Sequence, residues 1–450
     1  MNTADPRQTL ANSPMSVLQI IIVALTVGLN GLDGFDVLSI SFSANSIAKE
    51  WGLNDAVLGF VQTMELFGMV IGSIVLGGVA DRYGRRNTTL GCLVVMTFGM
   101  AMVSNSHSWE MLSVWRVLTG LGIGGLLAST NALAAEFSNS RRKDLSVSLM
   151  SMGYPLVGFI GGILAAWALR EYGNWRYIFG GGAVVTGCFI PLVYFFVPES
   201  VSWLCRKQPA GALEKVNAAL VRMGHAPVDS LPANPPGQKF NLSDLFSKTY
   251  IRTTILVAAA YFLHIGTFYF LLKGTPRLGF VFFDYPIPQA AGALGWANLG
   301  GAIGGIVIGL LAVMLSRFIG MKGLTIAFLL LGAAGINFFG NLHAIAGDAN
   351  GNVMLSQFVM TVVVTNFFLN GGVSGLYSIM AKVFPTHLRA VGTGFTIGMG
   401  RLGSILAVAL TGILIKDQLP FATIAMIMSV GSVLSCVTIW MLNTDEAKEH

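Results

Sequence analysis

Two acids and one base stand inside long apolar stretches of this sequence, where charged side chains are expensive to bury. Asp33 and Asp36 are three residues apart, so a helix places both carboxylates on one face. Arg116 occurs in a later apolar stretch, and its guanidinium can pair with either acid. A carboxylate that loses such a partner gains a proton more easily, which can couple proton uptake to movement. The alternative is a static ion pair that locks two helices together.

Two more titratable residues, Glu65 and His264, fall near the middle of apolar stretches. Either could hold a proton or contact a ligand, and we place Glu65 with the candidate proton sites and His264 with the candidate ligand contacts. His264 could equally be a hydrogen-bonded packing residue, and the sequence leaves this open. Tyr261, Phe268 and Tyr269 surround His264 in the sequence and could stack on a planar ring.

Arg401 lies near the centre of the apolar stretch 390–415, among glycines that leave room for a close approach. Its forked guanidinium matches a carboxylate, so we expect an anionic ligand. Tyr154 occupies the equivalent position in an internal repeat, and we expect it to face the same cavity. Arg116 and Asn370 are further candidate ligand contacts, with hydrogen bonding between helices as the alternative for Asn370.

The elements that carry these residues must be membrane helices. The chain is 54% hydrophobic and 11% charged, with a mean hydropathy of +0.69, whereas soluble domains carry about 25% charged residues. Twelve stretches reach the roughly 20 apolar residues of a transmembrane helix, at 16–40, 55–79, 88–106, 109–136, 145–169, 175–197, 252–273, 288–315, 322–342, 353–381, 390–415 and 420–442. The net charge of +6 therefore does not indicate nucleic-acid binding.

The sequence predicts an all-α membrane protein with 12 transmembrane helices in two pseudo-symmetric six-helix bundles. The predicted domains are residues 1–200, a cytoplasmic linker at 201–250, and residues 251–450. A shift of 247 residues aligns Gly124-Gly125 with Gly371-Gly372, Phe137 with Phe384, Arg142 with Arg389, and Gly153 with Gly400. Such a parallel repeat of six helices is typical of transporters that bind their substrate between the halves.

The distribution of basic residues predicts the orientation. With both termini in the cytoplasm, 18 loop Lys and Arg residues face that side and six face the other. Positive charge is enriched in cytoplasmic loops, so we predict that both termini are cytoplasmic.

A short charged segment between the second and third apolar stretches is a candidate gate. It contains one acid and three arginines among glycines, and its candidate gating residues are Gly77, Asp81, Arg82, Gly84, Arg85 and Arg86. Glu136, Arg142 and Arg389 are the further candidates at the same predicted side of the membrane. Ion pairs among them could close this side in one state and break in another. Alternatively, the arginines only anchor loops to anionic lipid.

Catalytic and cofactor chemistry is not indicated. The four cysteines are scattered without metal or redox spacing, and no nucleophile–base set appears. We therefore expect neither an enzyme nor a metal or cofactor, and we expect a monomer in the lipid bilayer.

These motifs together resemble the aromatic acid:proton symporter family within the major facilitator superfamily. The resemblance covers essentially the full chain, and its most specific element is Asp33-Gly34-Phe35-Asp36. The family's loop motif maps onto the charged segment described above, and its later motifs map onto Arg116, Glu136, Phe384-Pro385, Arg389 and Gly400-Arg401. One departure is the second loop motif, which reads Ser316-Arg317-Phe318-Ile319-Gly320 and lacks the usual acid.

The resemblance implies the major facilitator fold and a bacterial inner-membrane importer of a benzoate-like or hydroxybenzoate-like acid. The first-half aspartates would couple to protons, and Arg401 would hold the substrate carboxylate. The alternatives are transport of another organic anion, or a proton-antiporting exporter of metabolites or drugs. Pro198-Glu199-Ser200 resembles sugar transporters, but the matching motif after the last helix is absent. A sensor without turnover would normally need an output domain, which neither the linker nor the tail resembles.

Overall fold

The computed structural model describes residues 5–232, 242–315, 319–348, 352–384 and 388–442. Within these ranges it does not describe the side chains at positions 77, 81, 128, 144, 313, 381, 389 and 390. All regular structure in the described residues is helical. The predicted all-α architecture is therefore confirmed.

Twelve of the helices are long and apolar enough to cross a membrane. They are α2 (Val17–Trp51), α3 (Asp55–Tyr83), α4 (Arg85–Ser104), α5 (Trp109–Glu136), α6 (Lys143–Tyr172), α7 (Arg176–Phe196), α10 (Ile251–Phe283), α11 (Ile287–Met314), α12 (Met321–Gly340), α14 (Leu355–Val383), α15 (Arg389–Lys416) and α16 (Phe421–Trp440). Shorter helices are α1 (Pro6–Asn12), α8 (Val201–Lys207), α9 (Ala212–Arg222), the 3-10 helix η1 (Leu242–Phe246) and α13 (Leu342–Ala346).

Three helix ends differ from the sequence expectation in ways that matter for the site. The first predicted helix, 16–40, continues as α2 to Trp51 and therefore carries Asn45. The predicted helix ending at residue 273 continues as α10 to Phe283, so Lys273 and Arg277, which were counted as loop residues, are helical. The segment 77–83 is not a turn but the last part of α3, and the break is confined to Gly84. Hydropathy alone ended these helices early because charged side chains, among them Lys49, Arg82 and Arg277, lie on or near their last turns.

Helix starts follow local capping chemistry. Ser108 precedes α5, and its hydroxyl accepts the N–H of Met111 at 3.3 Å. Ser200 does the same for α8, accepting the N–H of Trp203 at 3.0 Å. A side-chain oxygen at this position satisfies a backbone donor that has no partner within the helix.

The contacts within the chain divide it into two compact units. The first comprises Met1–Val37, Gly68–Val157 and Arg176–Gln238, and the second comprises Leu38–Phe67, Gly158–Trp175 and Lys239–His450. Helices α2, α3 and α6 therefore each contribute one part to each unit. The units group residues by contact rather than by repeat, and the domain division predicted from the repeat stays a prediction.

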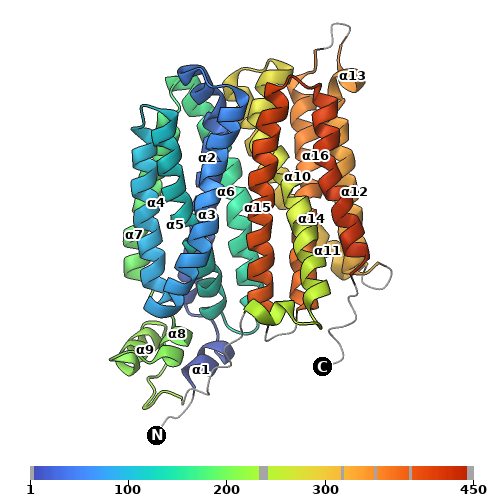
Figure 1. Cartoon of the computed structure of the whole chain (residues 1–450). Helices are drawn as coiled ribbons and strands as arrows, with labels where there is room; N and C mark the ends of the chain where they lie inside the picture. Colours follow the sequence, from blue (N-terminus) through green and yellow to red (C-terminus); the bar gives the residue numbers. More distant parts are fainter. Residues whose placement is uncertain (1–4, 233–241, 316–318, 349–351, 385–387, 443–450) are drawn as a thin grey trace. The chain divides into compact units, whose positions relative to one another are not determined.

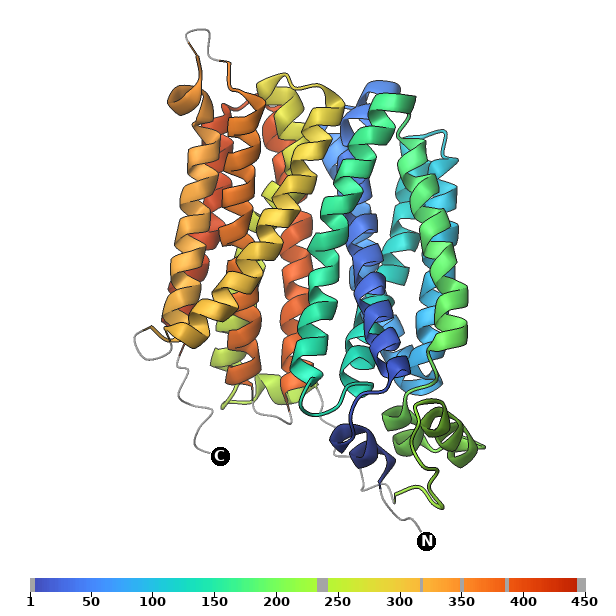
Figure 2. The same cartoon turned by 180° about the vertical axis from the view of Figure 1, so that it is seen from behind.

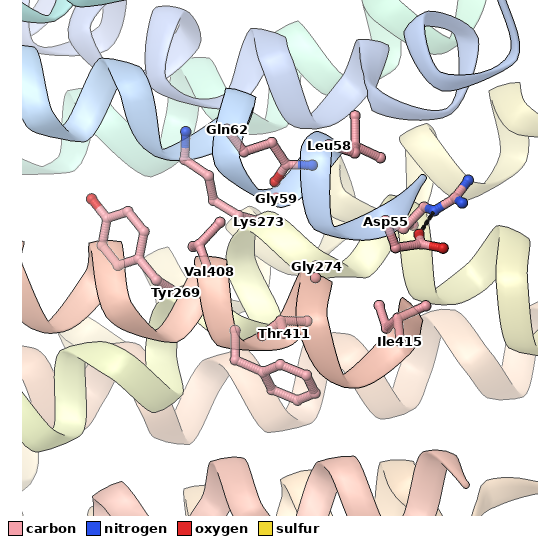
Figure 3. Close-up of a pocket in the computed structure, with 13 residues that line it drawn as sticks. Asp55, Leu58, Gly59, Gln62, Tyr269, Lys273, Gly274, Val408, Thr411 and Ile415 are labelled. Atoms are coloured by element: carbon pink, nitrogen blue, oxygen red, sulfur yellow. Dashed lines mark hydrogen bonds and ion pairs between the residues drawn. The ribbon is translucent and has the colours of Figure 1, made fainter. Parts of the chain in front are cut away.

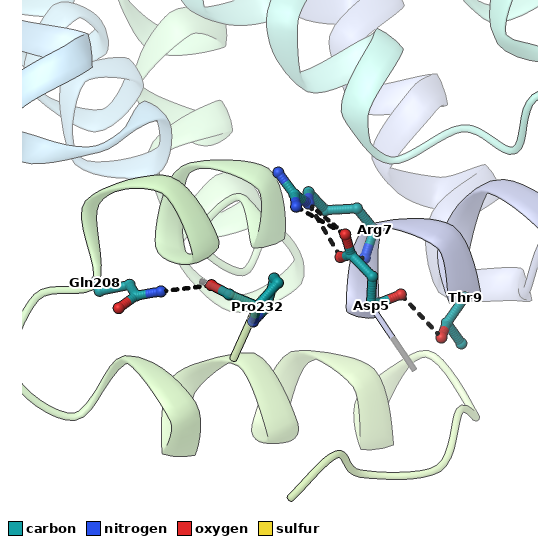
Figure 4. Close-up of polar contacts among 5 residues, drawn as sticks. All are labelled: Asp5, Arg7, Thr9, Gln208 and Pro232. Atoms are coloured by element: carbon teal, nitrogen blue, oxygen red, sulfur yellow. Dashed lines mark hydrogen bonds and ion pairs between the residues drawn. The ribbon is translucent and has the colours of Figure 1, made fainter. Parts of the chain in front are cut away.

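In the first unit, α4 packs along both α5 and α7. The short helices α1, α8 and α9 lie beyond one end of these long helices (Figure 1), where α8 contacts both α1 and α9. Figure 4 shows the polar contacts there: the Arg7 side chain donates to the Asp5 carboxylate at 2.7 Å, and Gln208 donates to the Pro232 carbonyl at 3.0 Å. The hydrogen bonds from Arg7 lower the pKa of Asp5.

In the second unit, α11 packs along α14, and α10 packs along α15 (Figure 2). Helix α12 contacts α14 and α16, and α16 also contacts α10. One end of this unit is filled by an aromatic cluster in which Phe339 meets Phe421 edge to face, with ring centroids 4.9 Å apart. Aromatic edge-to-face pairs favour such packing, and the cluster fixes the ends of the helices that carry the site below.

Candidate functional site

The centre of the first unit holds a buried ion pair between α2 and α5. The Arg116 guanidinium bonds to a carboxylate oxygen of Asp36, and both side chains are 0% exposed. A second Arg116 nitrogen donates to the Asp36 carbonyl at 2.9 Å, and the guanidinium carbon lies 5.4 Å from the centre of the Phe179 ring. Of the two pairings considered from the sequence, the structure forms Asp36–Arg116. Two charges with no access to water are stable only while they stay paired, because separation would leave each one buried without compensation.

Asp33 and Tyr154 lie beside this pair. Asp33 is 3% exposed, one turn before Asp36 on α2. Between the two acids, Gly34 contacts α6 so closely that an added Cβ would lie 2.6 Å from the Tyr154 carbonyl oxygen and 3.0 Å from its Cγ. Only glycine permits this approach. The structure thus brings together four of the predicted site residues, namely Asp33, Asp36, Arg116 and Tyr154.

A second charged group lies in the second unit, between the start of α3 and α10. Lys273 donates to Glu65 at 3.0 Å, and the two side chains are 1% and 0% exposed. One turn later, Arg277 donates to Asp55 at 2.6 Å with side chains 14% and 19% exposed. Asn45 of α2 donates to the carbonyl of Pro276 at 2.7 Å, so all three helices are tied at this point.

Asp55, Lys273 and Arg277 line a pocket together with α15. Figure 3 shows Lys273 extending toward α3 beside Gln62, with Tyr269 one turn away on α10. The α15 wall contributes Val408 and Thr411. The pocket therefore combines two cations, one acid and a phenol ring with a largely apolar wall. Of the predicted site residues it contains Tyr269, while Glu65 is the partner of the lining residue Lys273.

Arg401 lies deep in the second unit, on α15, with 8% of its surface exposed. Its neighbour Gly400 faces the Tyr261 ring so closely that an added Cβ would lie 2.3 Å from the ring. Arg401 and Tyr269 both interact electrostatically with Tyr261. The hydroxyl of Tyr261 is 2.9 Å from that of Tyr377 on α14. An arginine with three tyrosines is thus gathered from three helices.

His264 and Asn370 lie away from these charged groups. The two ring nitrogens of His264 are hydrogen bonded to the Ser432 hydroxyl at 2.8 Å and to the Leu369 carbonyl at 2.9 Å, and the side chain is 0% exposed. This is the geometry of the packing alternative. The Asn370 amide lies against Gly301 of α11, where an added Cβ would be 3.1 Å from its nitrogen.

Several candidate gate residues lie at one end of the first unit. Glu199, which the sequence analysis had not placed there, accepts hydrogen bonds from the backbone of two of them. Gly84 separates α3 from α4 with φ of +103°, a conformation that favours glycine. The Glu199 carboxylate accepts the N–H of Arg85 at 2.8 Å and of Arg86 at 3.2 Å. A carboxylate at the positive end of a helix dipole is favourable. Arg86 also donates to the carbonyl of Tyr194 at 2.7 Å.

Glu136 lies next to this cap. It accepts a hydrogen bond from the Ser200 hydroxyl, and Arg85 and Arg206 are within electrostatic reach. Arg82 is exposed, with its guanidinium 5.4 Å from the centre of the Tyr83 ring.

The other gate candidates do not join the Glu199 cap. Arg142 lines a hollow formed with residues 11–15 and 139–141. The side chains at Gly77, Asp81 and Arg389 lie outside the described part of the structure, as do Pro385 and Arg317. No group of three or more His, Cys, Asp or Glu side chains among the described residues is placed to hold a metal.

Three functional contacts were missed by sequence reasoning. Lys273 was assigned to a loop, Glu199 was considered only as part of a sugar-transporter motif, and Tyr377 was not considered. The one available signal was the four-residue spacing of Tyr269, Lys273 and Arg277, which places a polar residue on three neighbouring turns of α10, with Tyr261 two turns earlier on the same face.

Comparison with known proteins agrees with this architecture. The chain is 28% identical to a gallate transporter of Pseudomonas putida over 89% of this chain and 86% of the relative. It is 27% identical to the 4-hydroxybenzoate transporter PcaK of Acinetobacter baylyi over 98% and 94%. Among solved structures, a partially occluded inward-open form of the xylose transporter XylE from E. coli matches with a TM-score of 0.72 at 17% identity, over 95% of this chain and 98% of that chain.

The xylose transporter shares the fold, and at this identity the likeness extends no further. The model of the Major Facilitator Superfamily matches residues 23–355. With twelve candidate membrane spans, the chain therefore belongs to the Major Facilitator Superfamily and is a membrane transporter, not an enzyme.

Proposed function

We propose that the protein imports an aromatic carboxylate together with protons by alternating access. The observation that carries this proposal is the dry Asp36–Arg116 pair, with Asp33 and Tyr154 beside it. The relatives named as gallate, 4-hydroxybenzoate and benzoate transporters support the substrate class. The coupling ion is H⁺, and transport needs no cofactor.

The proton step follows from the charge balance at Asp36. While Arg116 is bound, Asp36 stays ionised because the cation compensates its charge. When the two helices separate, an isolated carboxylate in an apolar environment is too costly to remain charged, and it takes up a proton. Asp33, one turn away, supplies a second carboxylate on the same face. Asp36 is thus protonated in the conformation in which α2 and α5 have separated. It releases the proton in the conformation in which it pairs with Arg116.

The substrate step uses the second unit. Arg401 offers a forked pair of donors that matches a carboxylate, and Tyr269 offers a ring face for stacking. Glu65 is a further proton site by the same reasoning as Asp36. It is paired with Lys273, and it would take up a proton when that pair separates. We place the gate at Gly84–Arg86 and Glu136, where Glu199 holds the start of α4.

The experiment is uptake into proteoliposomes that contain a pH indicator. Addition of 4-hydroxybenzoate outside should acidify the interior, and Asp36→Asn should abolish acidification. Asp417→Asn, at the exposed end of α15, is the matched control and should behave as wild type. Uptake that continues unchanged after the proton gradient is collapsed would refute the coupling.

The alternative functions give different results in the same vesicles. An exporter that exchanges protons would make the interior more alkaline as its substrate enters. A transporter of another organic anion would show counterflow with that anion but not with benzoate-type acids.

We also propose that the protein is a monomer in the bacterial inner membrane. Both termini are proposed to be cytoplasmic, as the distribution of basic loop residues favours.

A further inference from the structure

The contact between Tyr261 and Tyr377 is not used by the mechanism above. The hydroxyl oxygens are 2.9 Å apart, and the ring centres are 5.7 Å apart at an angle of 48°. Tyr261 is 4% exposed, whereas Tyr377 is 43% exposed. Tyr261 is therefore buried in the unit, whereas part of the Tyr377 side chain lies at its surface.

The pair is held next to Arg401 by backbone packing. Gly400 allows the Tyr261 ring to lie against α15, since any side chain there would collide with the ring. Arg401 is the next residue and interacts electrostatically with Tyr261. A guanidinium and a phenol pair are thus positioned by the same contact between α10 and α15.

We propose that the Tyr261–Tyr377 pair recognises a ring hydroxyl of the substrate and so sets the preference for a hydroxylated aromatic acid over the same acid without the hydroxyl. This inference rests on the proposed function, in which Arg401 binds the carboxylate. The carboxylate of a hydroxybenzoate is charged and its ring hydroxyl is neutral. The Arg401 cation suits the carboxylate end, and the neutral Tyr261–Tyr377 hydroxyls suit the hydroxyl end. Each phenol hydroxyl both donates and accepts, as a ring hydroxyl does, so the pair can open and admit it.

A purely structural role for the pair makes a different prediction. If the hydroxyls only tie α10 to α14, their removal would affect transport of all aromatic acids equally. If they recognise a substrate hydroxyl, removal would affect only acids that carry one, because the lost hydrogen bond exists only with those acids. The ratio between two substrates therefore separates the two roles.

The test is the ratio of kcat/KM for hydroxybenzoate to that for benzoate in proteoliposomes, using 3- and 4-hydroxybenzoate. Wild type should prefer the better hydroxy acid about tenfold, the worth of one net hydrogen bond. Tyr377→Phe and Tyr261→Phe should each bring the ratio close to one while benzoate uptake persists. Tyr177→Phe, at an exposed tyrosine of α7, is the control and should keep the wild-type ratio.

The outcomes are distinguishable. An unchanged ratio in both variants, or equal loss of both acids, overturns the recognition role and leaves the proposed function standing. Failure of wild type to transport any of these acids overturns the proposed function and this inference with it. Each substitution keeps the ring and removes one hydrogen bond, so thermal unfolding without substrate should fall only slightly in both variants. The shift produced by added benzoate then gives a second readout of binding.

Discussion

The ion pair between Lys273 and Glu65 gives the sharpest stability prediction. Substitution Lys273→Met keeps most of the side-chain volume and removes the cation, which leaves the Glu65 carboxylate without its partner at 3.0 Å. At this distance and an effective dielectric constant near 20, the attraction is about 5 kcal/mol. Breaking a buried pair typically costs about 3–5 kcal/mol. We therefore expect Lys273→Met to lower the free energy of unfolding by about 3–5 kcal/mol.

The double variant should recover much of this loss. With Glu65→Gln added, neither charge of this pair remains buried. The second substitution should therefore restore stability and not reduce it further. Equilibrium unfolding in mixed micelles of the wild type, the two single variants and the double variant closes the cycle. Lys416→Met, at an exposed position of α15, should leave stability within about 0.5 kcal/mol of wild type.

A loss below about 1 kcal/mol in Lys273→Met, together with a coupling energy near zero, would show that the two groups do not form a dry pair and would refute the reasoning.

Three further predictions concern packing, capping and thiol reactivity. Gly34→Ala should destabilise the fold by about 1–3 kcal/mol through overpacking, because its Cβ would lie 2.6 Å from a backbone oxygen of α6; Gly91→Ala, with open space around it, should be tolerated in the same unfolding assay. Glu199→Ala should cost about 1 kcal/mol by removing the cap of α4, and an unchanged unfolding midpoint would argue against that cap. Burial raises the pKa of the Cys205 thiol to about 11, so a maleimide at pH 8 should label Cys205 far more slowly in the folded protein than after denaturation; equal rates by mass spectrometry would contradict the burial.

The transmembrane helices could be predicted because hydropathy is a local property. A run of about 20 apolar residues must form a helix in lipid, where every backbone polar group needs an internal partner. The same local reasoning placed Asp33 and Asp36 on one face of α2 and indicated Arg116 as a partner. It failed at the ends of α2, α3 and α10, where charged residues near the helix end lower the hydropathy although the backbone remains helical.

The pairing of distant charges could not be predicted in this way. Lys273 and Glu65 are 208 residues apart, and Glu199 is 114 residues from Arg85. Nothing local to either sequence segment selects these partners, because many acids and bases compete at similar predicted depths. Helix packing alone brings one carboxylate within hydrogen-bond distance of one cation.

The sequence by itself determined that this chain spans the membrane, carries charges inside its helices and resembles a transporter family. Only the tertiary structure decided which charges meet, that His264 is enclosed by Ser432 and Leu369, and that Tyr261 reaches Tyr377 across 116 residues. The physical reason is that hydropathy and helical spacing act over one or two turns. Hydrogen bonds and ion pairs between helices depend instead on glycine contacts and crossing positions that only the folded chain defines.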